Sequence, residues 1–202
     1  MSQESGDTST EGRALCETVR IDLGAGQRDA VRASLDRIAA IARSTGNPRI
    51  AACGAYFEGM SRYFTRDPKG ARKIWDTFTA TKAGRNAPRE SLWILVGSAA
   101  ASIDLFDPEA AVTQARKALQ IGSGLNGDAD LLPAWCNLAA GLYHSGRASE
   151  LEIPANRCLD LARKYKRRDA EASGLRRIGD VAGHKGHLEE ALERHQQSLT
   201  IY

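Results

Sequence analysis

Residues 172–202, ASGLRRIGDVAGHKGHLEEALERHQQSLTIY, decide the fold class of this chain. In the first half of the stretch, Leu175, Ile178 and Val181 recur three residues apart, which is typical of one face of an α-helix. In the second half, apolar residues at 188, 191, 192 and 199 mark one face of a second helix. Gly186 lies between the two runs and is a turn residue. The stretch therefore predicts a helical hairpin.

The hairpin is one unit of a repeat of 40 residues. Asp67-Pro68 recurs 40 positions later as Asp107-Pro108, and Gly146 precedes Gly186 by the same interval. The same step predicts turns at residues 26, 66, 106, 146 and 186, and units of about 12–51, 52–91, 92–131, 132–171 and 172–202. Since β-branched residues never alternate with polar ones over a useful length, we expect an all-α chain of at least nine helices.

The composition is typical of a soluble globular protein. The 202 residues carry 28 Lys and Arg against 25 Asp and Glu, and 42% of them are hydrophobic, which suits a sizeable core. We expect a single domain over residues 12–202, preceded by a disordered polar leader at residues 1–11. The longest uncharged apolar stretch, residues 92–103, is shorter than the roughly 20 residues of a membrane-spanning helix, so no membrane association is expected.

Four cysteines, Cys16, Cys53, Cys136 and Cys158, are widely spaced and form no CxxC pair. Their spacing and apolar or helical surroundings argue against a disulfide framework and against a zinc site. We therefore expect reduced thiols and a cytoplasmic protein.

The last unit resembles a tetratricopeptide repeat (TPR). The similarity lies at Leu175, Ile178, Gly179, Gly186, Ala191, Ser198 and Leu199, and in the preceding unit at Trp135, Leu138, Ala139, Leu142, Gly146, Cys158 and Leu159. The third and second units are similar at fewer positions, and the first keeps only Gly26 and the helical pattern. The resemblance implies a right-handed α-solenoid of about five stacked antiparallel helix hairpins, in a 40-residue variant found in signalling regulators. Small residues at 59, 99, 139 and 179 are then expected where helices cross closely.

No motif for catalysis, a cofactor or a metal is recognisable. The glycine run at 122–127 lacks the Lys-Ser/Thr that phosphate binding needs, and His184 and His187 straddle the predicted turn at Gly186. The basic run at 163–168 is read as a solvated helix end, and the net charge of +3 disfavours nucleic acid as a partner. We expect no enzyme activity, no catalytic residues, no cofactor and no metal.

The resemblance also implies a concave groove lined by the first helix of each unit. The matching positions are Tyr56, Met60, Tyr63, Trp93, Val96, Ile103, Cys136, Tyr143, His144, Arg176, Asp180 and His184. Such a lining, apolar in the middle and charged at one end, suits a partner helix or extended peptide with apolar anchors. The alternative, that these aromatic residues only pack within the hairpins, remains open at this point.

The sequence thus predicts a scaffold that binds a protein or peptide partner in its groove. Two alternatives stay open: a regulatory or sensor domain of a larger signalling or transcription-regulator protein, and self-association. For the latter, the last hairpin offers an apolar face for a homodimer, formed by Leu188, Leu192, Leu199 and Ile201.

Overall fold

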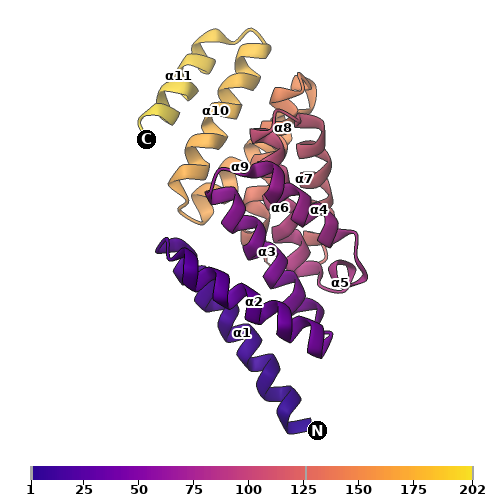
Figure 1. The fold of residues 1–202 in the computed structure, drawn as a ribbon. Helices are drawn as coiled ribbons and strands as arrows, with labels where there is room; N and C mark the ends of the chain where they lie inside the picture. The colour runs from indigo at the N-terminus through magenta and orange to yellow at the C-terminus, as the bar shows by residue number, and fades with distance from the viewer. Residues whose placement is uncertain (1, 126, 202) are drawn as a thin grey trace. The chain divides into compact units, whose positions relative to one another are not determined.

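The computed structural model describes residues 2–125 and 127–201, and contains helices and turns but no strand within them. Eleven α-helices and two short 3-10 helices follow one another in this part of the chain (Figure 1). Their bounds are α1 Ser2–Gly24, α2 Arg28–Thr45, α3 Pro48–Phe64, α4 Pro68–Thr79, α5 Lys82–Arg85, α6 Pro88–Asp104, α7 Pro108–Gly122, η1 Ala129–Leu131, α8 Leu132–His144, η2 Ala148–Glu150, α9 Glu152–Lys164, α10 Arg168–His184 and α11 Leu188–Leu199. The predicted all-α fold of consecutive helix hairpins is confirmed.

The five turns that the repeat predicts all have left-handed backbone at the predicted residue. The φ angles are +72° at Gly26, +61° at Arg66, +57° at Phe106, +70° at Gly146 and +82° at Gly186. In each case the next residue donates its backbone N–H to a carbonyl five residues earlier, as from residue 67 to Arg62 and from residue 187 to Ala182. This is the Schellman motif at the C-terminus of a helix. The feature that recurs every 40 residues is therefore a helix C-cap.

The Asp-Pro pairs begin the helices that follow two of these turns. Asp67 accepts a hydrogen bond from the N–H of Gly70 (2.8 Å), and Asp107 accepts one from Ala110 (3.2 Å). Each aspartate is an N-cap and is followed by proline at the first helical position. Proline has no backbone N–H, but an N–H at this position would make no hydrogen bond within the helix.

The chain divides into two compact units, Met1–Ser98 and Ala99–Tyr202, with the division inside α6. In the first unit α1 packs on α2, α2 on α3 and α3 on α4, and α1 also contacts α3. Its core contains Val19, Val31, Ile38, Ile41 and Ile50. The second unit repeats the scheme from α7 to α11, with a core around Leu138, Leu142 and Leu151 and a second cluster around Leu132, Cys158 and Leu161.

Helix α1 begins earlier than the sequence predicts. The expected disordered leader at residues 1–11 is wrong for residues 2–11, because α1 starts at Ser2. Tertiary contacts reach this segment: Glu11 pairs with Arg37 at 2.7 Å, and Gly12 is buried near Ile50. Polar composition alone does not reveal such contacts.

The expectation of reduced cysteines is also wrong, because the four cysteines form two disulfides, Cys16–Cys53 and Cys136–Cys158. Each bond joins two helices that pack against each other, α1 to α3 and α8 to α9. Sequence separations of 37 and 22 residues hide this proximity, because only helix packing creates it. The cysteines therefore no longer support a cytoplasmic location, which stays a prediction.

Within the described ranges, none of the helices combines the length and apolar character needed to cross a membrane.

Candidate functional site

A groove of about 1140 Å³ lies in the first unit, between α1, α3 and the first part of α6. Helix α1 contributes one wall, from Ser9 to Gly24, and α3 contributes the largest share of the apolar lining. The lining residues are Ser9, Arg13, Cys16, Glu17, Arg20, Leu23, Gly24, Asn47, Arg49, Ile50, Cys53, Tyr56, Phe57, Met60, Phe64, Glu90 and Trp93. The groove is thus formed by the first helices of consecutive hairpins.

Three aromatic rings line the groove close to one another. The Tyr56 ring meets the Phe57 ring edge-on with centroids 5.0 Å apart, and lies 6.3 Å from the indole of Trp93. Burial raises the pKa of the Tyr56 phenol, so this residue enters the groove as a neutral, largely apolar group. Trp93 is 37% exposed, which leaves indole surface open to a ligand.

Trp75 of α4 is hydrogen-bonded to the backbone of Tyr56, one of these three aromatic residues. Its Nε1 donates a hydrogen bond to the Tyr56 carbonyl oxygen (3.2 Å), and its side chain is fully buried against Gly59. Gly59 therefore leaves room for the indole of Trp75, whereas the sequence predicted a close approach of two helices at this position.

Charged side chains form the rim of the groove. Arg20 pairs with Glu17 at 2.8 Å on α1, while Arg49 Nε lies 3.9 Å from Glu90 Oε1. The other carboxylate oxygen of Glu90 is buried and has no hydrogen-bond partner among the residues that the structure describes. An acceptor left unsatisfied in this way costs folding free energy.

Three of the predicted groove residues, Tyr56, Met60 and Trp93, come together in this groove. Tyr63 does not line it: its ring lies 6.3 Å from those of Trp75 and Phe64. Val96 and Ile103, further along α6, are half-buried and also lie outside the lining.

In the second unit the predicted residues form a different cluster. Cys136 is half-buried and is bonded to Cys158. Tyr143 and His144 are neighbours at the end of α8, and Asp180 lies on α10. Arg176 and His184, also on α10, are both exposed.

The centre of this cluster is Arg177, which is not among the predicted groove residues. Arg177 is 4% exposed, bonds Asp180 Oδ2 at 2.8 Å and lies 4.2 Å from the Tyr143 ring centroid. Burial lowers its pKa, and Asp180 and Tyr143 oppose that effect.

Burial lowers the pKa of His144 too, and the cations Arg177 and Arg176 act in the same direction. This imidazole therefore stays neutral at a lower pH than an isolated histidine.

The basic run at 163–168 is largely neutralised by acidic neighbours. Arg163 pairs with Glu171 at 3.1 Å, and Lys164 pairs with Asp128 at 2.8 Å. The Asp128 carboxylate also accepts a hydrogen bond from the Tyr165 hydroxyl. The interpretation of this run as a solvated helix end agrees with these exposed pairs.

Sequence reasoning missed the contribution of α1 and several residues of α3. Phe57, Ile50 and Phe64 follow the same helix face as Tyr56 and Met60, so helical periodicity could have found them. No signal pointed to Arg13, Cys16 or Glu17, because the first unit resembles the family least.

The predicted self-association face is exposed. Leu188, Leu192 and Leu199 of α11 are 72%, 60% and 73% exposed, and Ile201 is half-buried.

This chain has the fold of the TPR-like repeat proteins. Two crystal structures of the TPR-like repeats of a Podosopora anserina putative kinesin light chain, one of them carrying a glutamine-to-methionine substitution, match it at 14% identity. The matches cover 94% of this chain and 93% of each other chain, with TM-scores of 0.66 for the substituted form and 0.64 for the other. No protein-family model and no curated protein matches the chain.

Proposed function

We propose that this chain is a scaffold that binds a peptide segment of a partner protein in the groove of the first unit. The observation that carries the proposal is the aromatic lining itself, with Tyr56, Phe57 and Trp93 gathered in one hollow. The groove volume of about 1140 Å³ exceeds the roughly 300–1,000 Å³ of small-molecule pockets, which favours a peptide.

The lining specifies the chemistry of the segment. Met60 and the three aromatic rings suit one or two large apolar anchors, since binding energy concentrates where such side chains are fully desolvated. Near Trp93, the carboxylate of Glu90 is held by a long link to Arg49 at 3.9 Å, and its negative charge suits a hydrogen-bond donor or a cation on the peptide.

The test begins with a displayed library of random peptides selected on the oxidised wild-type chain. A selected peptide is then titrated by calorimetry against wild type, Met60→Glu and Trp93→Ala. Each substitution should weaken binding by roughly 10- to 100-fold, because it removes an apolar contact at the centre of the groove. The matched control is Ile153→Glu, which places the same charge on the exposed surface of α9, outside the groove. Equal affinity for all four proteins would refute the proposal.

A second function, self-association, is favoured by the exposure of α11. Leu188, Leu192 and Leu199 recur at spacings of four and seven, so they form one stripe on the helix. Pairing of two such stripes about a two-fold axis would bury them. Sedimentation velocity over a range of micromolar concentrations should show a dimer that Leu192→Glu abolishes. A wild-type chain that stays monomeric throughout would exclude it.

A further inference from the structure

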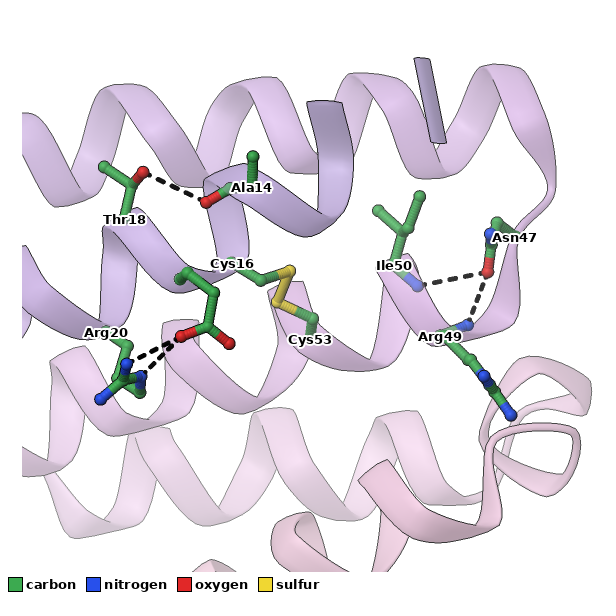
Figure 2. Close-up of a disulfide and its surroundings, with 9 residues drawn as sticks. Ala14, Cys16, Thr18, Arg20, Asn47, Arg49, Ile50 and Cys53 are labelled. Carbon is green, nitrogen blue, oxygen red and sulfur yellow. Dashed lines mark hydrogen bonds and ion pairs between the residues drawn. A yellow bond between two sulfur atoms is a disulfide. The ribbon is translucent and has the colours of Figure 1, made fainter. Parts of the chain in front are cut away.

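A disulfide joins two walls of the groove. Cys16 of α1 and Cys53 of α3 are both half-buried residues of the groove lining, and their sulfurs are bonded (Figure 2). The bond crosses from one wall to the other within the first unit. Its chemical state therefore bears directly on the shape of the groove.

Besides the disulfide, α1 meets α3 through apolar packing, since Val19 and Ile50 share one core cluster, and through one side-chain hydrogen bond. Asn47 Nδ2 donates a hydrogen bond to Ser9 Oγ at 3.3 Å, and Gly12 packs against Ile50. The ion pair between Glu11 and Arg37 ties α1 to α2 and not to α3. The disulfide is the covalent element that keeps the α1 wall beside the aromatic wall.

Two arginines flank Cys16 on α1. Arg13 and Arg20 precede and follow it by three and four residues, so all three lie on one face of α1, and all three line the groove. Arg20 also donates a hydrogen bond to Glu17, whose negative charge partly compensates the positive charge of Arg20. Nearby guanidinium groups lower the pKa of a thiol, and a thiol of low pKa leaves a disulfide faster.

We propose that Cys16–Cys53 is a site of thiol–disulfide exchange with small thiols, and that its reduction opens the peptide groove. This inference rests on the proposed function for its effect on binding, but not for the exchange itself. The thiolate of a small monothiol attacks the Cys53 sulfur, forms a mixed disulfide there and releases Cys16 as a thiolate. A second monothiol thiolate attacks the sulfur of the bound thiol. It forms the free disulfide and releases Cys53, so two thiols supply the two electrons and their protons pass to solvent or to the cysteines.

The second disulfide provides a control in the same chain. Cys158 is fully buried and Cys136 is half-buried, and the bond between them joins α8 to α9 in the second unit, outside the groove lining. A buried sulfur is less accessible to a thiolate, so this bond should be reduced more slowly.

The first experiment measures the exchange. The oxidised chain is incubated with millimolar glutathione, free thiols are alkylated at intervals, and the modified cysteines are counted by mass spectrometry. Cys16 and Cys53 should become modified at least roughly tenfold faster than Cys136 and Cys158. Arg13→Gln should slow the reaction several-fold, since the leaving thiolate loses a cation. Equal rates at the two disulfides, in a chain that circular dichroism shows to be folded, would overturn the proposal.

The second experiment measures the groove. Hydrogen exchange in α1 should rise when Cys16–Cys53 is reduced, and the selected peptide should bind roughly tenfold more weakly. The Cys16→Ser/Cys53→Ser variant should show the α1 exchange and peptide affinity of the reduced chain, and glutathione should not change them. The Cys136→Ser/Cys158→Ser variant should respond to glutathione as wild type does. If no peptide binds in either state, the proposed function fails, but the exchange rates and α1 protection still test the disulfide. Unchanged α1 protection on reduction would disprove the gating, whatever peptides do.

Discussion

Trp75 of α4 occupies the space that any side chain at Gly59 of α3 would need, since a β-carbon at position 59 would overlap the indole. The same indole approaches Gly97 of α6, where a β-carbon would lie 2.9 Å from its Cη2. Two glycines thus let one large aromatic residue fill the interior of the first unit. Through its hydrogen bond to the Tyr56 carbonyl, Trp75 also connects this packing to the groove.

Gly59→Ala should lower the free energy of unfolding by about 1–3 kcal/mol, because the added methyl group forces the buried indole to move. Chemical denaturation monitored by circular dichroism would measure this. The matched control is Gly183→Ala in α10, where a β-carbon would lie 3.7 Å from its nearest neighbour. There the better helix propensity of alanine should stabilise the chain by about 0.5 kcal/mol. A loss of similar size at both positions would contradict this account.

Phe106→Gly should stabilise the chain by about 0.5–1 kcal/mol. Phe106 has a φ of +57°, a conformation that strains residues with a β-carbon, and it is 94% exposed, so little packing is lost. Gly146, at the equivalent place in the next unit, provides the reverse test: Gly146→Ala should destabilise by about 1 kcal/mol. Thermal melts of the two variants should therefore shift in opposite directions.

Arg177→Ala and Asp180→Ala should each destabilise the chain by about 3–5 kcal/mol, because each leaves the partner's charge buried and uncompensated. The double substitution Arg177→Met/Asp180→Leu should cost much less than the sum of the two. A double-mutant cycle in urea provides the measurement. Strict additivity would show that the two side chains do not act as a pair.

His144 should make the chain less stable as the pH falls from about 7 to 5. Its pKa is lowered in the folded state by burial and by Arg177 and Arg176, so the unfolded chain takes up a proton first. Above the unfolded pKa of about 6.5 both states are neutral at this site, and its contribution does not change. Unfolding curves at several pH values should show a smaller loss for His144→Gln than for wild type. Parallel curves for the two proteins would argue against this role.

Removal of the Cys136–Cys158 bond should destabilise the chain by about 3 kcal/mol, the loop-closure estimate for a separation of 22 residues. Cys136→Ala/Cys158→Ala, measured by denaturation with the other disulfide intact, tests this value. If the variant is as stable as wild type, the bond adds nothing to the helix packing that already brings α8 and α9 together.

The sequence by itself determined the repeat and its helices. The Asp-Pro pairs at 67 and 107 and the glycines at 26, 146 and 186 act through the backbone within a few residues of each other, so a local pattern is enough to place them. Apolar spacing in the last hairpin was similarly local. The resemblance to the tetratricopeptide repeat implied the places of Tyr56, Met60 and Trp93 on one lining.

Only the tertiary structure decided which distant residues meet. The pairing of Cys16 with Cys53, the burial of Arg177 beneath Tyr143 and the place of Trp75 between two glycines all depend on how neighbouring helices pack. So does the ordering of residues 8–12, whose polar composition resembles that of a disordered segment until Glu11 meets Arg37. Periodicity identifies the face of a helix, but not the side chain that it meets on the next helix, because that depends on the crossing geometry of the two backbones.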